Sequence, residues 1–456
     1  MMTTQAPGVV LHNFYIYNPT YGPKEGQEHK KVLFFYPPSV NLDHQIRTIG
    51  LSEAVVQFAD EFSPSKPCES VHTQKTRQIY LNPEPDFWIV MTIQIPATFK
   101  TEDGKTVAEY HEEDVQDIVY QAVLEQAYTM FKFFMGSFVD IINKFSVEEL
   151  KNRLSHFFSK YLSTLRLNQS DILDIQNGIQ FLPLDKNTYL RIQCFINLVE
   201  ASFQQIKYTA FLYNDQLVWS GLEQDDMRTL YKYLTTSLFP SLLDTEESSS
   251  KGTHGSSHFG KFVKGPKDVK DTNSFIQIPS IYIHSATKTD VYHLVVYRAL
   301  SATVCLMVDG GAVPSRDWFH KIDSFLGPQL SRLASDIAEQ YANRKLSGGS
   351  QDYKFVYFNH MNLAQKTTVH SKKTAAVTIS PEILRLIADI NADFSKWDED
   401  GEALMRTWTD WWVVGKKSDQ REFYVAINQK NANLIEINEE VKKMCASHFT
   451  NIFFLD

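Results

Sequence analysis

A threefold recurrence of two short apolar strands followed by an amphipathic helix constrains the fold of this chain more than any other feature. In the first copy, apolar strands at residues 14–17 and 32–35 precede a helix whose apolar residues lie four, three and four positions apart. Those helix residues are Leu51, Val55, Phe58 and Phe62. Strands that alternate with helices of this period predict sheets covered by helices.

The second copy is the most compact of the three. Residues 210–213 face residues 217–220 across Asn214-Asp215, a pair of residues typical of a two-residue hairpin turn. The helix that follows presents apolar residues at helical spacing: Met227, Leu230, Leu234 and Leu238. The local sequence therefore predicts a hairpin followed directly by a helix.

The third copy begins with a strand at residues 355–358 and continues through a polar segment near residues 366–370. Its helix begins at Ser380-Pro381, because proline is favoured in the first turn of a helix. The residues expected to be buried by this helix are Ile383, Ile387, Ile390 and Phe394. No catalytic signature accompanies any copy, which favours a scaffold that binds other molecules.

The length of 456 residues exceeds what one ordinary core can bury and suggests roughly three units. We place them at residues 8–166, 167–345 and 346–456. The first unit should order its elements as strand, strand, helix, three strands and two helices, which predicts a five-stranded antiparallel sheet covered by helices. In the second unit, residues 244–273 are rich in Ser, Gly, Lys and Asp, and we expect most of this insert to be disordered.

Composition excludes several functions. The net charge of -9 argues against nucleic acid as a main ligand, because phosphate binding needs a dominant basic face. The four cysteines are widely spaced and predict reduced thiols of a cytosolic protein. The longest apolar stretch, residues 294–308, is interrupted and too short to span a bilayer, so any membrane contact is expected to be peripheral.

Three candidate sites fail on their chemistry. The phosphate-loop spacing at residues 255–261 is followed by Phe262, where a hydroxyl is needed to hold magnesium. His254 and His258 are four apart, but the residues between them form a poor helix and supply no carboxylate. Acidic residues such as Glu223 and Asp225 match the first turn of a helix. We therefore expect no catalytic residue, no metal and no cofactor, although catalytic groups scattered along the sequence would escape such a search.

Five stretches resemble, closely and in order, the calcium-caffeine-zinc sensitivity family. They are residues 14–19, 62–67, 72–75, 208–237 and 412–456. Within them, YTAFLYNDQ at 208–216 and NQKNANLIE at 428–436 are long co-linear matches, and the similarity runs from near residue 11 to the C-terminus. This family supplies one subunit of the MON-CCZ complex of animal and fungal cells.

The resemblance implies a mixed α/β (α+β) chain of three longin-like domains, each a mainly five-stranded antiparallel sheet flanked by helices. It also implies an obligate heterodimer with a MON-family longin subunit that exchanges guanine nucleotide on the late-endosomal Rab GTPase. The first domains of both subunits would pair into the GTPase platform, and the other two would build the core of the complex. The alternative is a longin-type trafficking adaptor or tether without exchange activity.

Further expectations follow from the family. In animals a propeller-bearing regulator is the third subunit, and an early-endosomal Rab is a candidate recruiter. The complex would work from the cytoplasm, bound peripherally to anionic or phosphoinositide membranes of late endosomes, lysosomes and autophagosomes. There it would support endosome maturation and autophagosome-lysosome fusion.

We place the GTPase contact on the breaks that flank the first helix and on the strand after it. The candidate residues are Ser63, Pro64, Ser65, Lys66, Pro67, His72, Thr73, Gln74, Lys75 and Arg77. The alternative is a rigid connecting loop, because Pro64 and Pro67 stiffen any backbone. For the partner subunit we choose Phe87, Trp88 and Val90, on a strand that could extend a partner's sheet edge or instead face its own core.

Overall fold

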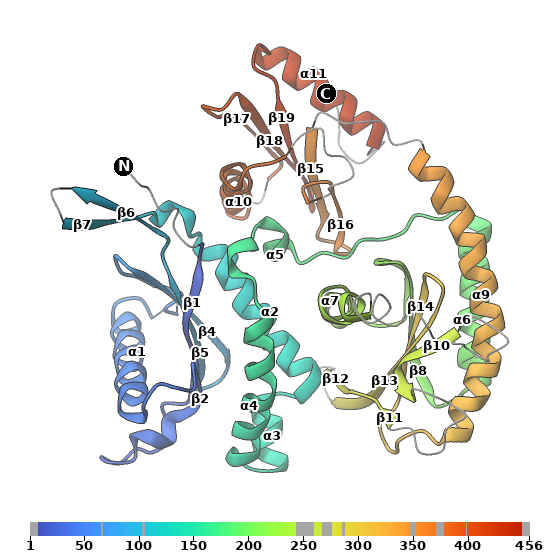
Figure 1. The fold of residues 1–456 in the computed structure, drawn as a ribbon, viewed down its shortest axis with the longest axis horizontal. Helices are drawn as coiled ribbons and strands as arrows, with labels where there is room; N and C mark the ends of the chain where they lie inside the picture. Colours follow the sequence, from blue (N-terminus) through green and yellow to red (C-terminus); the bar gives the residue numbers. More distant parts are fainter. Residues whose placement is uncertain are drawn as a thin grey trace. The chain divides into compact units, whose positions relative to one another are not determined.

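The computed structural model describes residues 8–64, 67–102, 105–242, 260–266, 276–284, 288–346, 353–370, 378–397 and 399–448. The chain divides into two compact units, Met1–Ile175 and Gln176–Asp456. The first unit contains one large sheet and the second contains two (Figure 1). We describe each unit by itself.

The first unit is a five-stranded antiparallel sheet in the order β2-β1-β5-β4-β3. Its strands are β1 (Val10–Tyr17), β2 (Val32–Tyr36), β3 (Ser70–His72), β4 (Thr76–Glu84) and β5 (Phe87–Gln94). Helix α1 (Leu42–Phe62) covers one face, whereas α2 (Asp117–Met135) and α4 (Val147–Thr164) cover the other (Figure 1). The predicted order of elements is confirmed. The sequence missed a two-stranded hairpin, β6 (Ala97–Glu102) and β7 (Lys105–Tyr110), and the short helix α3 (Phe138–Lys144).

Helix α4 packs on its face of the sheet through residues at a regular spacing of four. They are Leu150, Leu154, Phe158 and Leu162, and all are buried. The ring of Phe158 lies 4.9 Å from that of Phe14 on β1 and 5.7 Å from that of Phe34 on β2, between ring centroids. Burying one such side chain contributes about 1.5–3 kcal/mol, so this apolar seam fixes α4 against β1 and the end strand β2.

The second sheet belongs to the second unit and has seven strands. Its main path is β11-β10-β13-β14-β8-β9, and β12 pairs with β13. The strands are β8 (Ile206–Tyr213), β9 (Gln216–Ser220), β10 (Gly260–Pro266), β11 (Ile276–Gln277), β12 (Ser280–His284), β13 (Thr289–Ala299) and β14 (Ala302–Asp309). Helices α6 (Lys186–Ser202) and α9 (Arg316–Leu346) cover one face and α7 (Gln224–Tyr233) the other (Figure 1). Asn214 adopts a left-handed conformation (φ 53°) in the predicted hairpin turn.

Strand β10 lies inside residues 244–273, most of which we expected to be disordered, and the sequence did not predict it. It pairs with β13, and the ring of its Phe262 packs 4.9 Å from that of Tyr297 and 5.2 Å from that of Phe319, between centroids. Backbone pairing and one large aromatic side chain thus hold a strand within a polar segment. The rest of the insert lies outside the described residues, as do the phosphate-loop and histidine candidates at 254–259.

The third sheet has five strands in the order β16-β15-β19-β18-β17. They are β15 (Tyr353–Asn359), β16 (Ala364–Thr367), β17 (Gly401–Arg406), β18 (Trp411–Ser418) and β19 (Arg421–Asn428). Helix α10 (Pro381–Phe394) begins at the predicted Ser380-Pro381 and buries all four predicted residues. Helix α11 (Leu434–His448) packs on the other face through Ile437 and Val441. Strand β17 was not foreseen.

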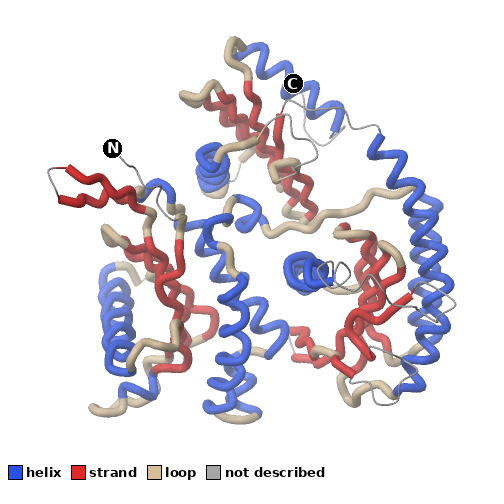
Figure 2. The backbone as a smooth tube through the Cα atoms, viewed as in Figure 1, coloured by secondary structure: helices blue, strands red, loops and turns tan. Residues whose placement is uncertain are grey.

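A short segment joins the second and third sheets edge to edge. Ile179 pairs in parallel with Ala364 on β16, and Phe181 pairs in parallel with Leu217 on β9. The backbone N–H of Ile179 donates to Leu363 O at 2.8 Å, and that of Leu182 donates to Leu217 O at 2.9 Å. Figure 2 shows this segment as the tan loop that runs between the two sheets. Both end strands therefore have their outer hydrogen bonds partly satisfied from within the unit.

We expect Gly178→Val to loosen this junction. A Cβ at position 178 would lie 2.5 Å from the Cβ of Gln365 and 3.0 Å from Cε2 of Phe358. Overpacking of this kind costs about 1–3 kcal/mol. Hydrogen exchange should therefore accelerate at Ile179 and Leu182. Gly221→Ala is the matched control, since its Cβ would make an ordinary 3.5 Å contact; equal exchange in both variants would contradict the tight fit.

Candidate interaction surface

The outward face of α1 leaves several large apolar side chains exposed. The stripe found in the sequence contains Leu51, Phe58 and Phe62, which are 62%, 64% and 75% exposed. The rings of Phe58 and Phe62 lie 4.6 Å apart, between centroids, and form one aromatic patch. We call Leu51, Val55, Phe58 and Phe62 the α1 stripe. Its side chains contribute little to the unit's own core.

A polar contact explains why the stripe points outward. On the inner side of α1, the buried Ser52 Oγ lies 2.6 Å from the Tyr15 hydroxyl and accepts a 3.3 Å hydrogen bond from the Tyr80 hydroxyl. Burial raises the pKa of both tyrosines above the ordinary value, so the phenols stay protonated at neutral pH. At the flank of the helix, Lys31 Nζ pairs with the Glu53 carboxylate at 2.7 Å. The sheet therefore holds α1 through the hydroxyl contacts of Ser52 and through the apolar packing of Ile49 and Val56.

The loop after α1 continues from the stripe. Ser63 ends the helix by donating its backbone N–H to Ala59 O at 2.8 Å. Ser63, Pro64 and Pro67 are exposed, as expected of a contact loop or of an ordinary connection. The two other loop candidates, Ser65 and Lys66, lie outside the described residues.

The remaining GTPase-contact candidates lie on the β3–β4 hairpin, at the β3 end of the sheet. The turn is tightly bonded, because Thr73 N–H donates to Thr76 O at 3.0 Å and Thr76 N–H donates to Thr73 Oγ1 at 2.9 Å. Thr73, Gln74 and Lys75 are exposed on this turn. The structure thus presents Lys75 on a firm, projecting loop.

Two candidates on the hairpin converge on a residue that sequence reasoning missed. Asp117 is the first residue of α2. Its Oδ2 accepts a hydrogen bond from Ser70 Oγ at 2.6 Å and lies 2.6 Å from His72 Nε2. The buried Arg77 places Nη1 3.3 Å from Asp117 Oδ1, an ion pair without hydrogen-bond geometry. His72 and Arg77 therefore brace the hairpin against α2. An acidic residue in the first turn of a helix was the only signal that could have drawn attention to Asp117.

The strand chosen for the partner subunit is not a sheet edge. Strand β5 lies in the middle of the sheet, paired with β1 on one side and β4 on the other, so the expected strand addition at Phe87, Trp88 and Val90 is wrong. Phe87 and Val90 are buried, and the Phe87 ring packs 5.3 Å from that of Phe138, between centroids. The structure agrees with the alternative, because Phe87 and Val90 face the core of their own unit. Contact between these residues and a partner stays a prediction.

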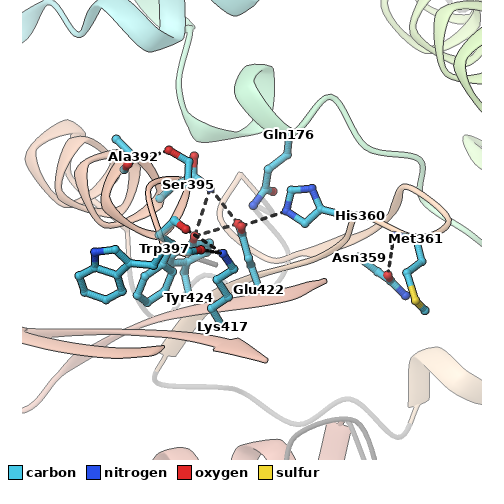
Figure 3. Close-up of polar contacts among 12 residues, drawn as sticks. Gln176, Asn359, His360, Met361, Ala392, Ser395, Trp397, Lys417, Glu422 and Tyr424 are labelled. Atoms are coloured by element: carbon cyan, nitrogen blue, oxygen red, sulfur yellow. Dashed lines mark hydrogen bonds and ion pairs between the residues drawn. The ribbon is translucent and has the colours of Figure 1, made fainter. Parts of the chain in front are cut away.

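A buried polar cluster lies in the third sheet, around Glu422 on β19 (Figure 3). Its side chain is 4% exposed. Oε1 lies 2.9 Å from Nε2 of His360, while Oε2 accepts hydrogen bonds from Asn391 Nδ2 and the Tyr424 hydroxyl, each at 2.8 Å. Both carboxylate oxygens are thus engaged by side chains of the same unit. The arrangement ties β19 to α10.

The protonation of Glu422 follows from the same contacts. Burial opposes the charged form, but the hydrogen bonds and charge from His360, and the hydrogen bonds from Tyr424 and Asn391, outweigh it and lower the pKa of the carboxyl. Burial, together with the Glu422 charge, raises the pKa of Tyr424. The cluster therefore combines an ionised carboxylate with a protonated phenol at neutral pH.

In the described parts of the chain, no helix is both long and apolar enough to cross a membrane. No group of three His, Cys, Asp or Glu side chains is placed to hold a metal ion there either.

Comparison with known proteins agrees with the three sheets. The model described as the first Longin domain of INTU, CCZ1 and HPS4 matches residues 11–136. Intu longin-like domain 2 matches residues 206–327, and Intu longin-like domain 3 matches residues 349–444. The expected fold class, three longin-like domains of antiparallel sheet flanked by helices, is confirmed.

Similar proteins cover essentially the whole chain. A "Vacuolar fusion protein CCZ1 homolog" of Nematostella vectensis is 55% identical over 100% of this chain and 99% of its own length. The protein of the same description from Xenopus laevis is 50% identical over 98% of this chain and 97% of its own. That from Dictyostelium discoideum is 33% identical over 97% and 98%, respectively.

We expect Glu422→Gln to remove a pH-dependent part of the stability. Because the folded pKa lies below the ordinary 4.5, this contribution is fully present above about pH 4.5 and is lost as the pH falls through the folded value. Loss of hydrogen bonds to a charged group costs about 1.5–3 kcal/mol at neutral pH. Denaturant midpoints measured from pH 7 to pH 3 should fall more steeply for the unsubstituted chain. Glu402→Gln, in an ion pair with Lys416 at 3.2 Å, is the control that should keep the steep fall.

Proposed function

This chain belongs to the family of CCZ1 vacuolar fusion proteins, as its sequence resemblance predicted, and we propose that it is the CCZ-type subunit of a guanine-nucleotide exchange factor. The family supports a role in vesicle-fusion trafficking. In the proposal, the chain pairs with a MON-family longin subunit, and the pair activates the late-endosomal Rab GTPase. Endosome maturation and autophagosome-lysosome fusion are the processes it would serve.

The α1 stripe is the observation that carries this proposal. Exposed apolar patches on soluble domains mark interaction sites, and aromatic residues dominate the energy of interfaces. The stripe leads directly into the exposed loop at Ser63 and Pro64 and on to β3, an end strand of the sheet. A second longin domain could place a helix on the stripe and a strand beside β3. We therefore assign this surface to the MON-family partner.

The exchange reaction needs no covalent chemistry from this chain. A surface that binds the nucleotide-free GTPase more tightly than the loaded form lowers nucleotide affinity by the same factor. Accelerating release by ~10³ requires that the open switch region be stabilised by about 4 kcal/mol relative to the closed one. A few buried apolar contacts supply a free energy of this size. The proposed reaction therefore needs no free carboxylate, which agrees with the hydrogen bonds that occupy both oxygens of Glu422.

We place the GTPase contact on the exposed β3–β4 turn and the loop after α1. Asp117 braces the hairpin through Ser70 and His72, so the turn need not become ordered on binding. Lys75 supplies a positive charge at its tip. The residues that remain candidates are Ser63, Pro64, Ser65, Lys66, Pro67, His72, Thr73, Gln74, Lys75 and Arg77, although Arg77 is buried and can act only through the hairpin.

The wider assembly is proposed on the family alone. In animals a propeller-bearing regulator would be the third subunit, and an early-endosomal Rab would help to recruit the complex. Peripheral contact with anionic or phosphoinositide membranes would hold it on late endosomes, lysosomes and autophagosomes. The second candidate function is a longin-type adaptor or tether, which the α1 stripe would serve equally well. Nucleotide release catalysed at low protein concentration distinguishes exchange from stoichiometric binding.

We expect the double substitution Phe58→Asp and Phe62→Asp to abolish pairing with a MON-family subunit. Each phenylalanine contributes about 1.5–3 kcal/mol when buried, and each aspartate would have to be desolvated. Co-purification and light scattering measure the pairing. Val139→Asp on α3, also an exposed apolar position, is the control that should pair normally. Normal pairing of the double variant would reject the α1 stripe as the interface.

We expect Lys75→Glu, alone or with Lys66→Glu, to slow nucleotide release by the heterodimer while pairing stays intact. The reversed charge at the tip of the hairpin would repel an acidic partner surface but lies outside the α1 stripe. Release of a fluorescent GDP analogue from the late-endosomal Rab measures the effect. Lys24→Glu, an exposed lysine in the loop before β2, serves as the control. Unchanged release by the Lys75 variant would remove the hairpin from the contact.

A further inference from the structure

A groove lies at the β2 end of the first sheet, opposite the β3 end. Strand β2 is the end strand there, and among the described residues no strand pairs with its outer side. A cavity of about 400 Å³ is lined by all five residues of β2, Val32–Tyr36. Successive side chains of a strand point to opposite faces, so five consecutive residues can line one cavity only along the strand's edge. The cavity therefore exposes the β2 backbone.

The far wall of this cavity is polar. Helix α4 contributes Lys151, Asn152, Ser155 and Ser159, and the start of α1 contributes Gln45 together with the nearby Pro38. We call these residues and β2 the β2 groove. The Phe34–Phe158 contact at 5.7 Å sets the distance between the strand and the helix. Large apolar side chains of β2 are turned into the core, where Leu33, Phe34 and Phe35 are buried.

The open edge of β2 beside the polar wall of α4 favours an extended peptide as the ligand. The outer edge of an antiparallel strand offers alternating backbone N–H and C=O groups, which another extended backbone satisfies. A groove between a strand edge and a helix is the setting in which peptides add as an extra strand. Five residues of β2 span about 17 Å, enough to pair with about five residues of a peptide. The hydroxyl and amide groups of α4 favour small polar side chains in that peptide.

Lys151 places a positive charge in the groove, which favours an acidic peptide. It is the one charged residue that lines the groove. Its Nζ lies 3.3 Å from Glu148, whose side chain is 78% exposed, so this surface ion pair is readily exchanged for another carboxylate. We propose that the β2 groove binds an extended, acidic segment of another protein by strand addition. The site is separate from the α1 stripe and the β3–β4 turn, so it does not depend on the exchange function.

Panning a phage library of random ten-residue peptides on the full chain tests the proposal. Enriched peptides should carry Asp or Glu and should slow hydrogen exchange within residues 32–36. In fluorescence anisotropy with a synthetic enriched peptide, Lys151→Glu and Ser155→Trp should each weaken binding at least tenfold. Lys160→Glu and His156→Trp change exposed residues of α4 that do not line the groove, and both should bind normally.

Three outcomes would overturn the proposal. Panning could yield no enrichment over the Ser155→Trp variant, the enriched peptides could leave exchange of the β2 amides unchanged, or they could bind the groove variants as well as the controls. Circular dichroism and pairing with the MON-family subunit show separately that each variant is folded. A failure of nucleotide exchange would leave the peptide result unaffected, so the two proposals can fail independently.

Discussion

Hydroxyl groups hold helix α1 on its sheet, and this polar contact determines what the first unit can offer to other proteins. Ser52 meets Tyr15 and Tyr80 in the buried interface, so the inner side of the helix needs few apolar residues. Ile49 is buried on that side, whereas Leu51, Phe58 and Phe62 are exposed, with Phe58 and Phe62 in ring contact. A helix attached in the usual way would bury this stripe. Here the stripe remains available for a second protein.

The sheets also differ in how they treat their edges. In the second unit, the segment around Ile179 and Phe181 pairs with β16 and β9, and so covers one edge of each sheet with the chain's own backbone. In the first unit, β2 and β3 end the sheet without such a cover among the described residues. Open edges invite strand addition, and natural proteins rarely leave them without a reason. The second unit keeps β11 and β17 as end strands, so the difference concerns β9 and β16, which its own chain covers.

Sequence reasoning succeeded where local signals and packing agree. The Asn214-Asp215 turn and the start of α10 at Pro381 depend on neighbouring residues, and both were placed correctly. It failed where the outcome depends on contacts distant in the sequence. The position of β5 inside the sheet, and so the burial of Phe87 and Val90, depends on pairing with β1 and β4. Strand β10 depends on the packing of Phe262 against Phe319, more than fifty residues away.

The same limit explains why the interaction surface could be found but not interpreted from sequence. A stripe at helical spacing looks the same whether it faces a core or a partner, and the contacts of Ser52 and Ile49 with the sheet show which side of α1 faces the core. Once the sheet is known, its geometry adds a further constraint. Four inter-strand spacings separate β2 from β3, so the two open edges lie about 19 Å apart. The partner proposed at β3 and the peptide proposed at β2 would therefore not displace each other.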